Sequence, residues 1–73
     1  MKREIILSDG KKVEMRKPKV RDIRAVAHIE TEEERELELF ANLTGLNKDE
    51  MEDMYLEDYS KLQDAYMGLA RGK

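Results

Sequence analysis

Few side chains in this 73-residue chain could support metal or nucleophilic chemistry, since it has one histidine, His28, and no cysteine. A transition-metal site needs several clustered nitrogen or sulfur ligands, so a lone histidine predicts none. The acidic segment 47–53 partly resembles a calcium loop. However, Met51 stands where an oxygen ligand belongs, and Glu52 stands where the turn glycine belongs. We therefore interpret the segment as a helix start with solvated carboxylates.

The other candidates for catalysis are carboxylates and hydroxyls. General acid–base catalysis needs carboxylates whose surroundings separate their pKa values, and a chain of 8.6 kDa seldom encloses such a pocket. Ser8 and Ser60 have no base nearby in the sequence to activate them as nucleophiles. The four glycines are isolated, so they form no phosphate-binding loop. The sequence predicts a protein that is not an enzyme and uses no cofactor.

Charge divides the chain into two unlike parts. Residues 1–24 hold nine Lys or Arg against four Asp or Glu, whereas residues 25–73 hold five against thirteen. The two blocks are either solvated faces of one domain or a basic surface that meets an acidic one on a partner or a second copy. No aromatic residue interrupts the basic part, so we expect no nucleic acid binding. No apolar run reaches the ~20 residues that span a bilayer, so we expect no membrane insertion or secretion.

The first sixteen residues predict a β-hairpin, because two apolar strands flank Ser8-Asp9-Gly10. A two-residue turn at Asp9-Gly10 would divide the apolar side chains between the two faces. A three-residue loop with Gly10 in the left-handed conformation instead pairs Leu7 with Lys11. We favour this loop, because a hairpin needs one face that packs against something else. The loop gathers the apolar side chains on one face: Ile5, Leu7, Val13 and Met15.

Helical patterns begin after Lys17-Pro18, which ends the second strand. In the first helix, an apolar stripe keeps helical spacing. Thr31 and Asn47 are each followed three residues later by a glutamate, the capping-box pattern that starts a helix. Gly45 is a natural helix stop between them. The stripe of the first helix consists of Val20, Ile23, Val26 and Ala27, with Ile29 as a further candidate. Off the stripe lie Arg21, Asp22 and Arg24.

The last predicted helix runs from about residue 55 to residue 70 and carries an apolar seam for packing against another helix. The seam consists of Tyr55, Tyr59, Leu62, Tyr66 and Leu69. The expected fold is therefore α+β, as one domain over residues 1–73. A two-stranded hairpin in residues 1–16 is followed by a small bundle of three to four helices in residues 19–71.

The order of these signals resembles one protein family. A strand pair that turns at Asp9-Gly10 is followed by Lys17-Pro18, Val20-Arg21-Asp22-Ile23 and Leu43-Thr44-Gly45-Leu46, and then by Asp58-Tyr59 with Leu62. This order resembles the small tail assembly chaperones of tailed bacteriophages, in particular those of Mu-like and P2-like phages with contractile tails. The likeness extends over nearly the whole chain.

The resemblance implies a late phage or prophage protein that acts in the host cytoplasm and is absent from the finished particle. Its partners would be the tape measure protein, which it keeps soluble, and the tail tube protein, whose polymerisation it assists. Such a chaperone needs an exposed apolar helical surface that accepts many similar segments, and methionine suits that role because it is flexible. We therefore predict a partner-binding surface formed by Met51, Met54, Leu56, Tyr66 and Met67.

An alternative function is a small phage or prophage module that assembles with itself and has no client. The basic and acidic parts of two copies could then pair and complete a thin core. A homo-oligomer is therefore a further expected partner state.

Overall fold

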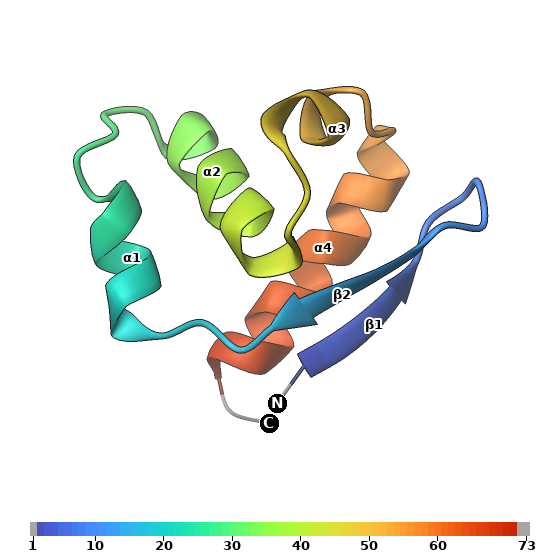
Figure 1. The fold of residues 1–73 in the computed structure, drawn as a ribbon, viewed down its shortest axis with the longest axis horizontal. Helices are drawn as coiled ribbons and strands as arrows, with labels where there is room; N and C mark the ends of the chain where they lie inside the picture. Colours follow the sequence, from blue (N-terminus) through green and yellow to red (C-terminus); the bar gives the residue numbers. More distant parts are fainter. Residues whose placement is uncertain (1, 72–73) are drawn as a thin grey trace.

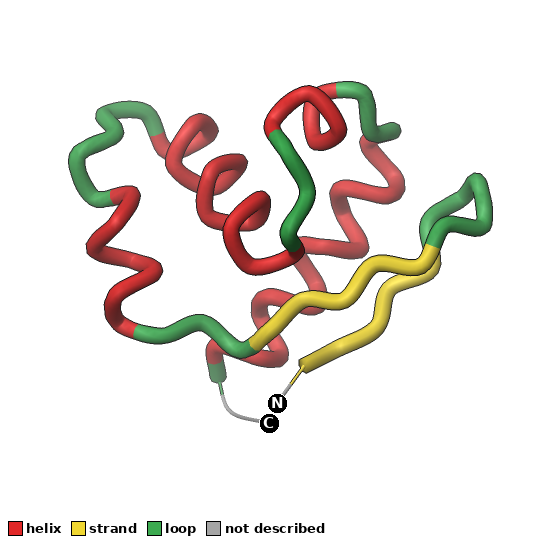
Figure 2. Tube along the Cα trace, viewed as in Figure 1, coloured by secondary structure: helices red, strands yellow, loops and turns green. Residues whose placement is uncertain are grey.

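The computed structural model describes residues 2–71, which form a two-stranded antiparallel hairpin followed by four helices (Figure 1). The hairpin runs along one side of the molecule and the helices gather against it (Figure 2). None of the described helices is long and apolar enough to cross a membrane. The predicted α+β class is confirmed. The elements are β1 (Lys2–Ile6), β2 (Lys12–Arg16), α1 (Val20–Val26), α2 (Glu32–Thr44), α3 (Lys48–Glu52) and α4 (Leu56–Ala70).

The hairpin adopts the register of the three-residue loop. Ile5 pairs with Val13, and the Leu7 amide donates to the Lys11 carbonyl at 2.8 Å. Gly10 has a φ of +88°, in the left-handed region that glycine enters without strain. The predicted apolar face is therefore confirmed, and all four of its side chains are buried: Ile5, Leu7, Val13 and Met15.

The core lies between this face of the hairpin and the helices α2 and α4. Phe40 of α2 is fully buried, and its ring centroid lies 5.6 Å from that of Tyr59 and 5.3 Å from that of Tyr66. Tilted rings at this separation attract each other beyond their burial. Aromatic side chains therefore join α2 to α4.

The predicted helix boundaries after residue 30 are confirmed. The Thr31 hydroxyl accepts a hydrogen bond from the Glu34 amide at 3.3 Å, and Gly45 ends α2 with a φ of +81°. Asn47 and Glu50 bond reciprocally, side chain to backbone, at 2.8 and 3.0 Å. These local signals fix both ends of α2 and the start of α3.

Helix α4 buries a narrower seam than the predicted one. Leu62 and Leu69 are buried, together with Ala65, which was not predicted. Tyr55 precedes the helix and is 70% exposed. At the hairpin side of the helix, the Lys61 ammonium donates to the Ile6 carbonyl at 3.0 Å. The N-terminal half of α4 is therefore held to the last residue of β1.

The predicted apolar stripe of α1 is mostly exposed. Val26 is buried, but Val20 is 76% exposed and Ile23 is 43% exposed. The helix is seven residues long and packs mainly on α2. A seven-residue helix that packs mainly on one neighbour buries few of its apolar side chains, so helical spacing alone overestimated the buried apolar face.

A buried carboxylate, Asp22, joins β2 to α1. It accepts two hydrogen bonds from the Arg16 guanidinium, at 2.8 and 2.7 Å, and one from the Lys19 amide at 2.7 Å. These bonds, that from Arg16 above all, lower the pKa of Asp22 to about 2. Asp22 lies off the predicted apolar stripe, and the stripe pattern did not indicate this role. An arginine at the strand end and an aspartate in the first turn of the next helix are the signal that could have revealed it.

We predict that Asp22→Asn lowers the free energy of unfolding by about 1–3 kcal/mol at neutral pH, because it removes charge-assisted hydrogen bonds to a buried group. The folded-state pKa lies below the ordinary value of 3.8. The carboxylate therefore stabilises the fold fully above that value, and this contribution disappears as the pH falls through about 2. Urea denaturation over a pH series measures the effect.

Asp64→Asn is the control, because Asp64 is exposed on α4. It should change the free energy of unfolding by less than about 0.5 kcal/mol. A penalty for Asp22→Asn that stays constant down to pH 2 would contradict the assignment.

Candidate partner-binding groove

The linker between α3 and α4 is a ridge with a hollow on each side. Met54 lines both hollows. Beside it, Tyr55 and Leu56 project into solvent, and Leu56 is 86% exposed.

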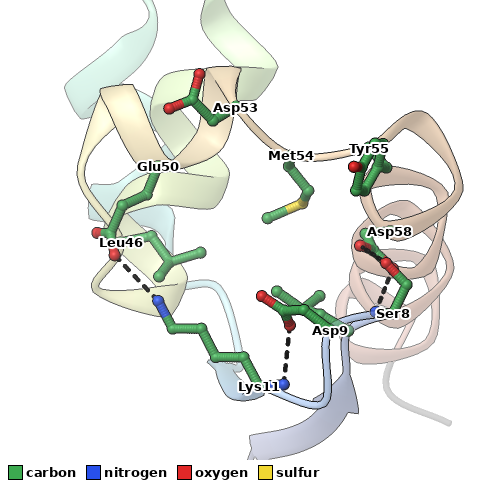
Figure 3. Close-up of a pocket in the computed structure, with 10 residues that line it drawn as sticks. Ser8, Asp9, Lys11, Leu46, Glu50, Asp53, Met54, Tyr55 and Asp58 are labelled. Carbon is green, nitrogen blue, oxygen red and sulfur yellow. Dashed lines mark hydrogen bonds and ion pairs between the residues drawn. The ribbon is translucent and has the colours of Figure 1, made fainter.

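Charged and polar residues outnumber apolar ones around the hollow on the hairpin side (Figure 3). Asp58 accepts hydrogen bonds from the Ser8 amide at 2.9 Å and the Ser8 hydroxyl at 2.8 Å. Burial acts to raise the pKa of Asp58, but the bonds from Ser8 and the charge of Lys61 outweigh it, so that the pKa is lowered. Lys11 pairs with Glu50 at 3.1 Å. These polar groups tie the hairpin turn to α3 and α4.

Metal chemistry has no support in this hollow. Within residues 2–71, no group of three or more His, Cys, Asp or Glu side chains is placed to hold a metal ion. Asp58 lies in the first turn of α4. Its bonding partner, Ser8, is fifty residues away in the sequence, so no local pattern could have predicted the pair.

The second hollow, here called the α2–α4 groove, has apolar walls and an acidic rim. Leu37, Met54 and Leu56 contribute apolar surface from three different elements or linkers. The acidic residues of the rim come from α2 and α3. The full lining consists of Glu33, Glu36, Leu37, Met51, Glu52, Met54, Leu56, Tyr59 and Gln63.

Hydrogen bonds to Glu36 cross from α4 to α2. The Tyr59 hydroxyl donates to the Glu36 carboxylate at 2.8 Å, and the Gln63 side-chain amide donates to the same oxygen at 3.1 Å. Burial, and then the adjacent Glu36, raise the pKa of Tyr59 above its ordinary range. Tyr59 therefore remains a neutral donor at physiological pH.

A further hollow continues beyond these bonds, between α1, α2 and α4. Glu36 lines both hollows, so they adjoin. Ile23, Leu39 and Tyr66 supply apolar walls there, and Glu32 adds to the acidic rim. Apolar side chains and acidic residues of α2 therefore line two adjoining hollows between Leu56 and α1.

Of the five predicted partner-binding residues, three line the α2–α4 groove, Tyr66 lines the adjoining hollow, and Met67 lines neither. Leu56 is exposed, Met67 is 49% exposed, and Met54 and Tyr66 are partly buried. Met51 also lines the groove, but it is only 2% exposed, so it contributes little of the groove's surface. The reason is the shortness of α3, whose one buried apolar side chain is needed to join it to the core.

Leu56 and Met67 are separated by eleven residues, about three helical turns, and so lie on the same side of α4. The exposed residues Tyr55, Val20 and Ile23 were not predicted as surface contacts. The sequence pattern assigned each of them to a packed seam or stripe.

Comparison with known proteins gives one family. A family model described as phage tail assembly chaperone proteins, E, or 41 or 14, matches residues 3–71. No curated protein and no solved structure gives a significant match. The matched range includes the hairpin turn and all the motifs on which the resemblance was based, so that resemblance is confirmed.

Because Leu56 is exposed and Met51 is buried, substitutions at these two positions should change the free energy of unfolding by different amounts. Leu56→Asp should change the free energy of unfolding by less than about 0.5 kcal/mol, since the side chain is exposed and an acid is favourable in a first helical turn. Met51→Ala should cost about 2–5 kcal/mol through the cavity it leaves. Urea denaturation of the two variants tests the contrast, and equal losses would show that the ridge is part of the core.

Proposed function

The chain belongs to the phage tail assembly chaperone family, and on that premise we propose that it binds the tape measure protein and assists assembly of the tail tube around it. It would act in the host cytoplasm before the tail is complete, and without catalysing a reaction. The observation that supports this proposal most is the exposed apolar surface of the ridge and α4, set beside a groove with an acidic rim.

A tape measure protein needs protection because its apolar helical stripes stay uncovered until the tube encloses it. Exposed apolar patches of this kind cause aggregation. A chaperone can cover them by receiving one helix face in an apolar groove, as many helix-binding proteins do. The α2–α4 groove and the side of α4 that carries Leu56 and Met67 offer such a surface.

The exposure of Leu56 makes it the main contact in this proposal. Full burial of a leucine side chain contributes about 1.5–3 kcal/mol. Met54 and Met67 flank it as flexible side chains that adjust to different partners, which suits a client with many similar segments. Tyr66, held against Phe40, would add a more rigid contact.

The acidic rim indicates the charge of the preferred segments. Glu33 and Glu52 are exposed at the groove and would attract apolar helices flanked by Lys or Arg. The negative surface that remains around the bound helix would also keep the complex in solution.

We predict that Leu56→Asp combined with Met67→Asp weakens binding of the tape measure protein by at least about tenfold, because each change places a charge where apolar surface is buried. Co-expression with the tape measure protein of the same phage, followed by affinity purification, measures the change.

Ile6→Asp is a suitable control, because Ile6 is also half exposed but lies on the outer face of the hairpin. Circular dichroism checks that the variants are folded. Undiminished recovery of the tape measure protein with the folded double variant would refute the surface assignment.

A further inference from the structure

One carboxylate lies where the α2–α4 groove meets the hollow that adjoins it. Glu36 of α2 is partly buried, and it lines both hollows. Apolar walls stand on either side of it, since Leu37 lines the groove and Leu39 lines the adjoining hollow. A partner that covers both hollows must therefore also cover this carboxylate.

Two hydrogen bonds hold the Glu36 carboxylate in place, and both end on the same oxygen. The Tyr59 hydroxyl donates to Oε1 at 2.8 Å, and the Gln63 side-chain amide donates to Oε1 at 3.1 Å. The other oxygen, Oε2, has no hydrogen-bonding partner within residues 2–71. No fully buried side-chain oxygen or nitrogen in that range lacks a partner, so Oε2 reaches solvent. It is therefore a fixed anionic acceptor that is open to a further donor.

The walls of the two hollows supply no cation to this oxygen. Among the described residues that line them, Arg35 is the one basic residue. Its guanidinium instead donates to the Ile29 carbonyl at 2.8 and 3.1 Å and to the Glu30 carbonyl at 3.2 Å. The other charged residues of the two linings are glutamates, so negative charge accumulates around Oε2.

A purely apolar partner surface would be a poor cover for Oε2. An anionic oxygen that loses water without gaining a donor raises the free energy of the complex. A lysine or arginine of the partner would instead donate a charge-assisted hydrogen bond, which is stronger in a partly buried setting than between exposed groups. Because Oε1 already accepts two bonds, the partner meets a single oxygen, so an ammonium fits as well as a guanidinium.

The spacing of residues along α4 indicates where this basic residue would stand in a partner helix. Tyr59 lines the groove, Gln63 bonds to Glu36, and Tyr66 lines the adjoining hollow. These three α4 residues are four and three positions apart, so they follow one another along one side of the helix. A partner helix that lies along them meets first an apolar hollow, then Glu36, and then a second apolar hollow about two turns further on.

We propose that Glu36 selects client helices that carry a lysine or arginine within their apolar stripe. The basic residue stands about one turn from an apolar residue on each side, and the two apolar residues fill the two hollows. Helices whose stripe is apolar throughout bind less tightly, because they leave Oε2 covered and unpaired. The exposed glutamates of the rim attract basic residues without fixing their position, whereas Glu36 fixes it. Glu36 thereby adds a sequence preference to the proposed function, on which this step rests.

Two synthetic helical peptides of about 20 residues and identical composition test this preference with the full chain. Both carry a stripe of leucines. The first has a lysine at the central stripe position and a methionine on the opposite face, and the second has these two residues exchanged. Fluorescence anisotropy measures the dissociation constant of each complex. We expect the first peptide to bind about tenfold more tightly, because it alone places a cation against Oε2 while the net charges are equal.

Glu36→Gln removes the charge but keeps an oxygen that can accept from Tyr59 and Gln63. The preference should then disappear or reverse, because the lysine of the first peptide meets no anion between the apolar walls. Asp64→Asn is the matched control, since it removes one negative charge from an exposed residue that lines neither hollow, and it should keep the preference. Glu33→Gln, on the rim, should weaken the binding of both peptides alike and leave their ratio unchanged.

Equal or absent binding of the two peptides by the native chain would overturn the proposal, as would a preference that survives Glu36→Gln in a variant that circular dichroism shows to be folded. The tape measure protein tests the proposed function separately. If the peptides are distinguished as expected but the tape measure protein is not retained, the selectivity of the groove stands and the proposed client is wrong. If the tape measure protein is retained through Leu56 and Met67 while the peptides bind equally, the proposed function stands and the role of Glu36 is wrong.

Discussion

The rest of the structure depends on covering one apolar face of a two-stranded hairpin. Such a hairpin is barely stable alone in water, because it has no second layer. Here α2 and α4 form that layer over Ile5, Leu7, Val13 and Met15. A buried aspartate fastens each end: Asp22 joins the end of β2 to α1, and Asp58 joins the turn to α4.

This arrangement also explains why a groove exists at all. The hairpin covers one side of α2 and α4, and the described residues include no third layer to cover the other side (Figure 1). Tyr59, Gln63 and Glu36 bridge the two helices there through hydrogen bonds, so the open side has a defined shape. In a chain this small, a single core is completed on one side only, and the remaining apolar side is available for a partner.

The parts of the fold that sequence predicted correctly are those set by neighbouring residues. Gly10, Gly45, Thr31 and Asn47 act through the backbone within a few positions, so the turn, the hairpin register and the helix limits could be derived. The burial of Met51 and the exposure of Val20 depend on the length of each helix and on the elements that it packs against. The spacing of apolar residues in the sequence does not contain this information. The candidate site was therefore predicted in part: Leu56 and Met67 are exposed, whereas the groove walls from α2 required the structure.

Both buried aspartates lie within motifs that carried the family resemblance, and their roles in joining the hairpin to the helices give those motifs a structural meaning.

The bond from Lys61 to the Ile6 carbonyl has a consequence for behaviour at high concentration. Backbone groups on an unpaired strand edge are templates for adding extended chains, the first step towards cross-β aggregates. In the hairpin register, Ile6 directs its carbonyl to the outer edge of β1, and the Lys61 ammonium occupies it. The chain thereby places a positive charge against its own strand edge, where it discourages the addition of another strand.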